Sequence, residues 1–597
     1  MRRCLWGAVA VLVGFVCGIP VAYADTVAAS HGTEPRSLAR LFDNTAVSDD
    51  TRPGEADFDG SGSSLSAQDL TAAGWTPGRA LTVQGARLSR PRAEAGEPDN
   101  VRADGQSVRV RGRGDALAFL VAGTGGTDLS GTGTGTVRYT NGSGSSYRLS
   151  APDWRGGPLA TKAVALPHIN TPGGPLAQKA KLYVVTVPIA AGREVASVRL
   201  PRNRDLHVFA LAVRPSTRGW TGTWAVSASG YTAVGPWTDR TLRLVVHTSA
   251  GGPRVRIRLD NTFASAPVRI GGASVAVQAT GAQAAAPPVP LSFRGAAGTE
   301  IPAGAQAFSD PVGFDVPADA NLLVSFHLPG TVTAAPVHQL AVQRSYVSEP
   351  GDHADDAAPD AYTSTITNWP LLTGVDVAGG PGSVVVLGDS ITDGEKSTQG
   401  ANHRWPDVLA TRLRNQHVVP HYGVLNQGIS ANRVVTDRYP GDGISTDTGG
   451  VSALHRLDRD VLAQTSARTA LVFEGVNDVR WGASADQVVA GLREIADRAH
   501  ARGIRVLAAT IAPCEGETLC TAAADTQRTA VNAWIRDNVR DSKYLDGVLD
   551  FDAVLRDPAH PARLLPAYDS GDHLHPGDAG LAALADSVDL GSLVPRT

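Results

Sequence analysis

Residues 384–390 read Val-Val-Val-Leu-Gly-Asp-Ser, an unbroken apolar run that is followed at once by a polar turn. Such a run is typical of a strand buried on both faces, which occurs in parallel sheets covered by helices. The turn after such a strand lies at the carboxyl edge of the sheet, where open α/β sheets bind their ligands. We therefore expect a parallel strand here, with Ser390 at the functional edge.

Strand and helix patterns alternate from this point to the end of the chain. Further strands are predicted at 418–425, 469–473, 504–511 and 548–551, and helices at 405–414, 452–464, 485–502, 522–538 and 576–588. Right-handed crossovers between parallel strands leave an α/β/α three-layer, flavodoxin-like fold as the simplest topology. We expect this domain to occupy residues 378–597.

Two all-β regions are predicted ahead of it, because a chain of 597 residues is too long for one core. Short alternating segments separated by Gly, Pro, Asn and Asp fill residues 25–215, and a second set fills residues 216–377. Their spacing favours two sandwich-like or jelly-roll-like domains. In the second region, Trp220, Trp224 and Trp237 are expected to be core residues in preference to a sugar-stacking surface.

The first 24 residues are typical of a secretory signal. Residues 2 and 3 are arginine, residues 5–19 form an apolar run, and residues 22–24 read Ala-Tyr-Ala. A charged start, a short apolar run and small residues at a cleavage site define such a signal. We expect residues 1–24 to be removed and the mature protein to be secreted, without an integral membrane segment.

The cysteine count predicts one disulfide, and the charge distribution argues against binding to nucleic acid. Beyond the signal only Cys514 and Cys520 remain, and in an oxidising compartment we expect them to form a disulfide. The formal net charge is -4, and no stretch carries the clustered Lys and Arg that a phosphate backbone requires. Nucleic acid is therefore not an expected partner.

The segment 57–60 lacks the ligand spacing of a helix-loop-helix calcium site and is expected to form a turn.

Polar residues follow three of the predicted strands. The segments 388–392 (Gly-Asp-Ser-Ile-Thr), 426–428 (Asn-Gln-Gly) and 475–478 (Gly-Val-Asn-Asp) each come directly after an apolar run. A fourth polar segment, 569–576, follows the last strand through a loop. The carboxyl ends of parallel strands share one edge of the sheet, so we expect the four segments to converge there.

Together the four segments contain the residue types that an acyl-transfer reaction needs. Ser390 can act as a nucleophile if a base takes its proton. His575 is the candidate base, and Asp572 can accept a hydrogen bond from its other ring nitrogen. The backbone N–H groups of Ser390 and Gly428 and the side-chain amide of Asn477 are candidate donors to an oxyanion. We expect neither a metal nor an organic cofactor.

These segments, in this order and with these separations, resemble the four signature blocks of the SGNH or GDSL hydrolases. The resemblance covers about residues 380–597, and residues 220–377 also resemble the β segment that precedes this domain in secreted bacterial and fungal members. Ile391 stands where the family's usual motif has Leu, which conserves volume. The resemblance implies Ser390 as nucleophile, Asp572 and His575 as the rest of a triad, and Gly428 and Asn477 as oxyanion donors.

Other interpretations of this region stay open. A zinc site made of Asp572, His573 and His575 is the main chemical rival, although it needs a further ligand and leaves Ser390 without a role. The residues around the start of the predicted helix 405–414 are candidates for the substrate pocket or for purely structural roles. They are Asp393, Asn402, His403, Arg404 and Trp405.

The sequence therefore predicts a secreted serine esterase that acts through an acyl-enzyme. Only 185 positions separate Ser390 from His575, which leaves no room for a separate lid and favours an open cleft for short acyl groups. Because the β regions resemble modules of carbohydrate-active enzymes, an acylated polysaccharide or glycoside is the expected substrate. A lipase or phospholipase activity, and a noncatalytic carbohydrate-binding cell-surface protein, are the alternatives.

Overall fold

The structure, a computed structural model, describes residues 34–127, 130–541 and 543–595. The predicted signal at residues 1–24 lies outside them. Among the described residues, no helix combines the length and the apolar character needed to cross a membrane.

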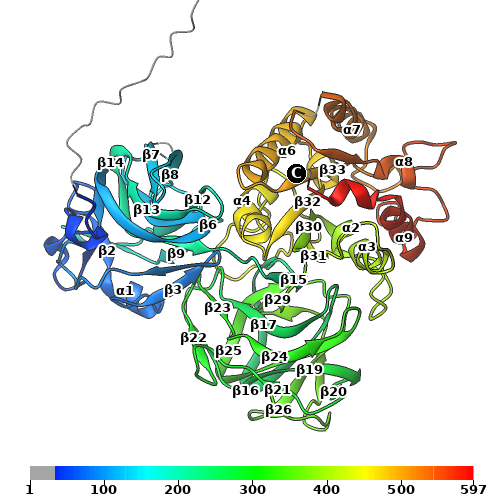
Figure 1. Cartoon of the computed structure of the whole chain (residues 1–597), viewed down its shortest axis with the longest axis horizontal. Helices are drawn as coiled ribbons and strands as arrows, with labels where there is room; N and C mark the ends of the chain where they lie inside the picture. The colour runs from blue at the N-terminus through cyan, green and yellow to red at the C-terminus, as the bar shows by residue number, and fades with distance from the viewer. Residues whose placement is uncertain (1–33, 128–129, 542, 596–597) are drawn as a thin grey trace, which may run out of the picture. The chain divides into compact units, whose positions relative to one another are not determined.

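The C-terminal domain is built on one sheet of five parallel strands (Figure 1). Its order is β31-β30-β32-β33-β34, so the first strand lies inside the sheet and the second at its edge. This order is the flavodoxin-like one. The strands are β30 (Ser383–Gly388), β31 (Gly423–Gly428), β32 (Ala467–Phe473), β33 (Arg505–Ala509) and β34 (Gly547–Leu549).

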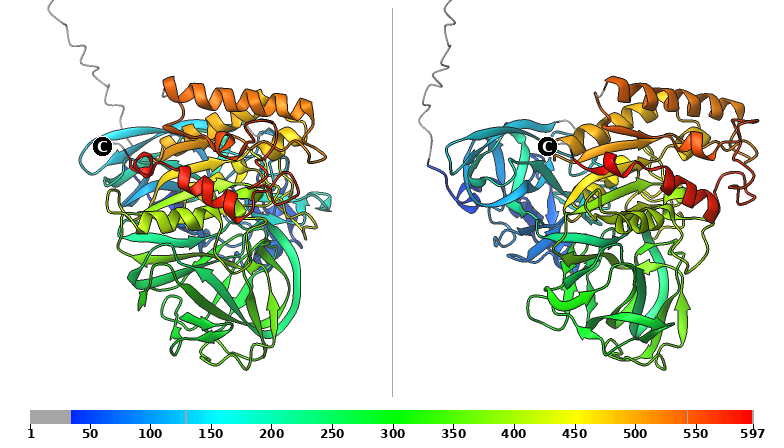
Figure 2. Two further views of the ribbon diagram at one scale, coloured as in Figure 1. Left: turned by 90° about the vertical axis from the view of Figure 1, so that its right-hand side faces the viewer. Right: turned by 45° about the vertical axis from the view of Figure 1, so that its right-hand side comes forward.

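Helices cover both faces of this sheet, and Figures 1 and 2 show α6 and α7 on one side and α3 and α9 on the other. Alternate residues of β30 explain the two layers: Val385 and Leu387 pack under one helical layer, and Val384 and Val386 under the other. The predicted three-layer α/β/α fold is confirmed. The helices are α2 (Ser390–Asp393), α3 (Trp405–Arg414), α4 (Ala453–Leu457), α5 (Val476–Arg480), α6 (Ala485–His500), α7 (Ala522–Asp541), α8 (Phe551–Leu555) and α9 (Asp578–Ser587).

Most predicted elements of this domain lie within a few residues of the observed ones, and two differ. The strand predicted at 418–425 is β31 at 423–428, because Pro420 lacks an N–H for the ladder and Val418 is 92% exposed. The helix predicted at 452–464 is α4, followed by a π-helical turn over Asp458–Leu462.

Where the structure describes it, the N-terminal region is all-β apart from the short helix α1 (Ala67–Ala72) and two 3-10 turns, as predicted. Its main sheet runs in the order β5-β14-β6-β13-β7-β8, with β12 on β6 and β9 on β12. These strands are β5 (Val101–Asp104), β6 (Ser107–Gly123), β7 (Gly131–Tyr139), β8 (Gly144–Ala151), β9 (Lys162–Leu166), β12 (Ala180–Pro188), β13 (Glu194–Arg199) and β14 (Arg202–Pro215). A small sheet joins β1 (Val47–Ser48), β2 (Ser64–Ser66), β10 (Ile169–Thr171) and β11 (Gly174–Leu176).

The second region is also all-β and has two large sheets. One contains β15 (Trp220–Ala225), β29 (Leu372–Ala378), β17 (Gly252–Asp260), β23 (Gln306–Phe308) and β24 (Val312–Val316). The other contains β20 (Gln283–Ala284), β19 (Ala273–Thr280), β21 (Val289–Pro290), β25 (Asn321–His338), β16 (Gly230–His247), β26 (Ser345–Pro350), β27 (Ser364–Ile366) and β28 (Trp369–Pro370). A separate pair is β18 (Val268–Ile270) with β22 (Thr299–Ile301). As expected, Trp224 and Trp237 are buried, whereas Trp220 is only partly buried.

The two β regions are joined by shared structure. Strands β3 (Ala80–Val83) and β4 (Ala86–Ser89) come from the N-terminal region but extend a sheet of the second one, where Gln306 of β23 lies opposite Thr82. The fully buried Trp75 donates from Nε1 to the Ala303 carbonyl at 2.8 Å. Apolar residues of both regions accordingly form one continuous core cluster.

Candidate active site

Ser390 is the first residue of α2, directly after β30. The Asp389 side chain caps this helix by accepting the Ile391 N–H at 3.0 Å. The cap fixes the turn between strand and helix, so Ser390 is held at the carboxyl edge of the sheet. Its side chain is nearly buried, with 4% of the residue exposed.

His575 and Asp572 come from the loop between α8 and α9 and meet Ser390. His575 Nε2 lies 2.8 Å from Ser390 Oγ, and His575 Nδ1 lies 2.8 Å from Asp572 Oδ2. Asp572 Oδ1 also accepts the N–H groups of Leu574 and His575, at 3.0 and 2.8 Å. With the Nδ1 proton directed to the carboxylate, Nε2 is free to accept the hydroxyl proton of Ser390.

These hydrogen bonds also set the charge of Asp572. Partial burial by itself would raise the pKa of its carboxyl, but the N–H and imidazole of His575 and the Leu574 N–H hold that pKa well below its usual range. The carboxylate therefore stays ionised over the whole physiological pH range.

Asn477 lies in α5, after β32, and its amide is held on two sides. Nδ2 donates to the Asn432 carbonyl at 3.0 Å, and Oδ1 accepts from Arg480 Nη1 at 2.9 Å. An amide nitrogen has two protons, so one N–H of Asn477 remains for a further acceptor. The backbone N–H of Ser390, at the start of α2, is a second donor at this edge.

Gly428 does not fit its predicted oxyanion role. Its N–H already donates to Asn426 Oδ1 at 2.9 Å, so it is engaged within its own loop. Glycine is required here for packing, because a Cβ would lie 2.3 Å from the Asp393 nitrogen and 2.7 Å from its Cα. Gly428 thus allows the end of β31 to pack against the backbone of α2.

The sequence interpretation missed Ala431 in the same loop. Its φ is 61°, and among the described residues its N–H has no hydrogen-bond partner. Its neighbours are tied to the site: the Ser430 N–H donates to Asp393 Oδ2 at 2.9 Å, and the Asn432 carbonyl accepts from Asn477. An alanine gives no sequence signal for a left-handed conformation. The one signal that points to Ala431 is its position in the loop after a strand that ends at this edge of the sheet.

Trp405 and Asp393 are not substrate-pocket residues, and these two predictions are wrong. Trp405 is fully buried and packs edge-to-face on Phe551, because it begins the core-facing stripe of α3. Asp393 is 3% exposed and faces His338 of the second β region, 3.0 Å away. It shares with Arg404 a cavity of only about 20 Å³, which is too small for a substrate.

Of the other three pocket candidates, Arg404 donates from Nε to the Asp393 carbonyl at 3.0 Å, and the remaining two also lie on the loop before α3. Asn402 contacts His247 at 3.1 Å and Asn321 at 3.3 Å, so it joins this loop to the second β region. His403 is largely exposed and pairs with Asp578 at the start of α9, at 2.7 Å.

Two charged side chains flank the triad-like group instead, and an exposed aromatic ring follows the Asn477 helix. Glu395 Oε2 lies 3.7 Å from His575 Nε2, and Lys396 Nζ lies 3.7 Å from Asp572 Oδ2. Trp481 follows α5 and is 39% exposed, with the guanidinium of Arg433 4.3 Å from its ring centroid. The sequence interpretation missed these residues because none belongs to a recognisable motif.

Beneath the site lies a group of buried carboxyls. Burial raises the pKa of Asp389 to about 7 and that of Asp478 to about 6, and burial also raises the pKa of Glu474 well above its usual range. Asp478 accepts the N–H groups of Val434 and Val435, at 2.8 and 3.2 Å. Asp389 and Asp478 brace the loops around the site through these hydrogen bonds. Glu474 instead lies 3.6 Å from the guanidinium of the buried Arg456.

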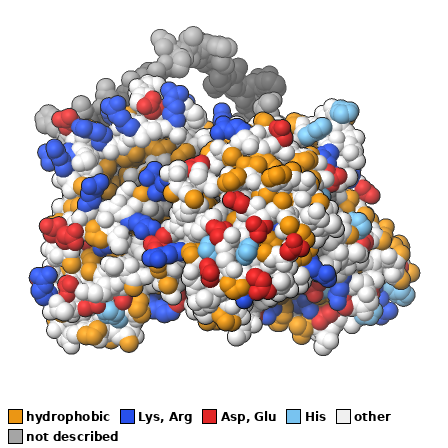
Figure 3. Space-filling view, turned by 90° about the horizontal axis from the view of Figure 1, so that it is seen from below, with side chains coloured by type: hydrophobic (Ala, Val, Ile, Leu, Met, Phe, Trp, Pro, Cys, Tyr) orange, Lys and Arg blue, Asp and Glu red, His pale blue; other side chains and the backbone are white. Residues whose placement is uncertain are grey.

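The three residues of the zinc alternative point to different partners. His573 Nδ1 pairs with Asp569 at 2.6 Å, whereas His575 and Asp572 are bonded to each other. Figure 3 views the molecule from below Figure 1, from the side of the second β region, and shows acidic and histidine side chains among apolar ones on that face. In the described ranges, however, no three or more His, Cys, Asp or Glu side chains are grouped so that they could hold a metal ion. The segment 57–60 forms a turn in which Asp57 accepts the Gly60 N–H.

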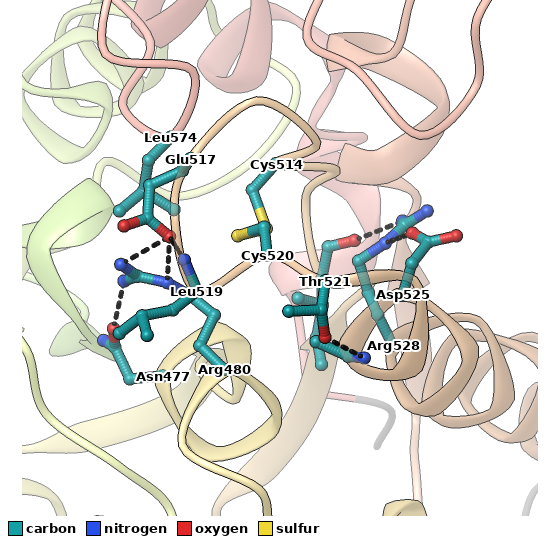
Figure 4. The surroundings of a disulfide bond; sticks show 12 residues. Asn477, Arg480, Cys514, Glu517, Leu519, Cys520, Thr521, Asp525, Arg528 and Leu574 are labelled. Carbon is teal, nitrogen blue, oxygen red and sulfur yellow. Dashed lines mark hydrogen bonds and ion pairs between the residues drawn. A yellow bond between two sulfur atoms is a disulfide. The ribbon is translucent and has the colours of Figure 1, made fainter.

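The predicted disulfide is confirmed. Cys514 and Cys520 are joined in the loop between β33 and α7, next to Leu574 and to the side chains that contact Asn477 (Figure 4).

Comparisons with known proteins agree with this organisation. Residues 386–583 match the GDSL-like Lipase/Acylhydrolase family, and residues 34–217 match the AziU2-like beta-sandwich domain. No curated protein sequence matches the chain.

Solved structures match the chain over about a third of its length. A GDSL-like lipase from Bacteroides thetaiotaomicron is 20% identical, with 34% of this chain and 84% of that one covered and a TM-score of 0.26. A catalytic mutant of an acetylxylan esterase from Geobacillus stearothermophilus is 20% identical, with 34% and 91% covered and a TM-score of 0.27. By its match over residues 386–583, the C-terminal domain is a GDSL-like lipase/acylhydrolase domain, and on this ground the chain is a carboxylic ester hydrolase.

Proposed function

We propose that the chain is a serine esterase in which Ser390 is the nucleophile, His575 the general base and Asp572 its orienting carboxylate. The observation that carries this proposal is the unbroken chain of two 2.8 Å contacts from Ser390 Oγ through the imidazole to Asp572. The burial of Ser390 and its place at the start of a helix support the same role.

The reaction follows from this geometry. Ser390 Oγ attacks the acyl carbon while His575 Nε2 takes the hydroxyl proton, and the tetrahedral oxyanion accepts hydrogen bonds from the Ser390 N–H, the Ala431 N–H and Asn477 Nδ2. The imidazolium then gives its proton to the departing alkoxide, which leaves an acyl-enzyme and an alcohol. Water, deprotonated by His575, releases the acid and restores Ser390.

For the substrate we propose short-acyl esters of carbohydrates. The rim of the site supports a polar alcohol, since Glu395 and Lys396 lie beside the imidazole and its carboxylate. The exposed ring of Trp481, eight residues after the end of β32 and directly after the Asn477 helix, suits the apolar face of a sugar. Secretion, proposed from residues 1–24, would bring the enzyme to extracellular polysaccharides.

A lipase is the second candidate, and an ester panel separates the two. We expect acetylated sugars and acetylated xylan to be cleaved, and p-nitrophenyl esters to be cleaved progressively more slowly as the acyl chain lengthens from acetate to palmitate. A preference for long acyl chains, with no cleavage of sugar acetates, would favour the lipase.

Substitution of the nucleophile tests the mechanism. Ser390→Ala should lower ester hydrolysis by several orders of magnitude, because no other group can form the acyl-enzyme. The melting temperature should change little, since a single hydroxyl contributes little to packing. A fluorophosphonate probe should label the wild type and not the variant. A folded Ser390→Ala protein that keeps its activity would refute the assignment, and so would wild-type protein that cleaves no ester.

A further inference from the structure

The amide of Asn477 has a fixed orientation, and one side chain fixes its oxygen. Arg480 Nη1 donates to Asn477 Oδ1 at 2.9 Å, while Asn477 Nδ2 donates to the Asn432 carbonyl. A flipped amide would set its nitrogen against the guanidinium and its oxygen against the carbonyl, which are two repulsive pairings. Arg480 therefore decides which way the second N–H of Asn477 points.

Arg480 is itself held by an acidic residue from a distant loop (Figure 4). Its Nε lies 3.0 Å and its Nη2 2.9 Å from Glu517 Oε2. The Arg480 side chain is only 8% exposed and that of Glu517 is 20% exposed. Such a doubly bonded, largely buried guanidinium has little freedom to leave its position.

Glu517 lies inside the ring that the Cys514–Cys520 disulfide closes. The Glu517 N–H donates to the Cys514 carbonyl at 3.1 Å, and the Cys520 N–H donates to the Glu517 carbonyl at 3.0 Å. The carboxylate also accepts the Leu519 N–H at 2.9 Å. Both the backbone and the side chain of Glu517 are thus tied to the closed loop.

The same loop packs on the other half of the site. A Cβ on Gly516 would lie 2.9 Å from the His573 ring, and both cysteines pack in one apolar cluster with Leu574. Figure 4 shows Leu574 beside Glu517. The loop therefore lies between the helix that carries Asn477 and the segment that carries Asp572 and His575.

We propose that Arg480 is a positioning residue for the oxyanion donor Asn477, and that the disulfide-closed loop 514–520 holds it there through Glu517. The proposal rests on the oxyanion role of Asn477 in the proposed function. According to this proposal, the disulfide affects the reaction rate although it contains no reacting group. Opening the ring would loosen Glu517, then Arg480, and then the Asn477 amide that stabilises the transition state.

Kinetics of p-nitrophenyl acetate hydrolysis test this chain of contacts in the full-length protein. Arg480→Met roughly keeps the length of the side chain but removes its hydrogen-bond donors. We expect kcat to fall roughly 10- to 100-fold, which does not exceed the fall expected when one whole oxyanion donor is removed. Glu517→Gln should lower kcat by roughly 3- to 10-fold. KM should stay within about 2-fold for both, because the amide acts on charge that develops only in the transition state.

The same loop supplies a matched control. Glu515 is also an acidic residue paired with an arginine, Arg563, at 3.2 Å, but this pair is exposed and makes no contact with Asn477. Glu515→Gln should leave kcat unchanged. An equal loss in Glu515→Gln and Glu517→Gln would show a general effect of the loop and would overturn the proposal.

A double-mutant cycle separates positioning from loss of stability. In an Asn477→Ala background, Arg480→Met and Glu517→Gln should cause little further loss of kcat, because the side chain that they position is gone. If each substitution lowers kcat by the same factor in the Asn477→Ala background as in the wild type, the proposal is overturned. A folded Arg480→Met protein with wild-type kcat would also overturn it.

Reduction tests the role of the ring. Dithiothreitol, with thiol titration to confirm opening, should lower kcat of the wild type about as much as Glu517→Gln does, and should have little effect on Glu517→Gln or Asn477→Ala protein that is still folded. Unchanged wild-type kcat after complete reduction would refute this step. Because Ser390→Ala is assayed in parallel, a failure of the proposed function is recognised by its unchanged activity, independently of these outcomes.

Discussion

Asn477 contributes a single amide to the site, and its hydrogen bonds indicate what removing it should do. Asn477→Ala deletes one oxyanion donor and should lower kcat by roughly 100-fold or more with a smaller change in KM. Steady-state kinetics on a short p-nitrophenyl ester measure both constants. An increase in KM at constant kcat would instead assign Asn477 to substrate binding.

Asp389, beside the nucleophile, should make stability depend on pH. Burial raises the pKa of Asp389 to about 7 from a value of 3.8 in the unfolded chain. Between these values the unfolded chain releases the proton and the folded chain keeps it, so folding loses stability as pH rises through this window. Asp389→Asn retains a side-chain oxygen for the cap and cannot ionise. Its melting temperature should therefore decline less than that of the wild type between pH 4 and pH 7; parallel profiles would contradict the buried, protonated state.

At the scale of elements, the contact between the end of β31 and α2 positions the nucleophile. Gly428→Ala would place a Cβ 2.3 Å from the Asp393 nitrogen, so α2 and Ser390 must shift. We expect a lower melting temperature and a kcat reduced by roughly 10- to 100-fold, since small displacements of reacting groups are costly. Gly313→Ala, whose Cβ meets nothing within 4 Å, is the control. Wild-type activity in Gly428→Ala would show that this contact does not position Ser390.

The same element shows how far sequence reasoning extends. The apolar run 384–387 predicted β30 and the three-layer fold, because a strand buried on both faces has a distinctive pattern. Glycine at 428 stands out directly after a predicted strand, but the sequence pattern does not distinguish a glycine needed for close packing from one that offers its N–H to a ligand. Trp405 was misplaced for a related reason: a residue beside a predicted cleft also begins a helix whose apolar stripe faces the core. Contacts between distant loops, such as Glu517 with Arg480, have no local signal.

At the scale of the whole molecule, the second β region reaches into the support of the active site. The fully buried Arg456 donates to the Ser227 hydroxyl of that region at 3.0 Å and to the Gly388 carbonyl at the end of β30, also at 3.0 Å. His338 contacts Asp393, which in turn accepts the Ser430 N–H beside Ala431. The β region thus contacts the residues that hold the loop carrying a proposed oxyanion donor.

The shared core of the two β regions predicts that they unfold together. Trp75 belongs to the N-terminal region, but its ring is fully buried and its Nε1 donates to Ala303 of the second region. Trp75→Ala should therefore destabilise both regions, by roughly 3–5 kcal/mol for the loss of a buried aromatic side chain. Calorimetry should show the β transition moving to lower temperature as one peak, and limited proteolysis should attack residues 35–377 throughout. Release of residues 35–217 alone, with the second region still resistant and its transition unmoved, would show that the two regions are independent despite their common core.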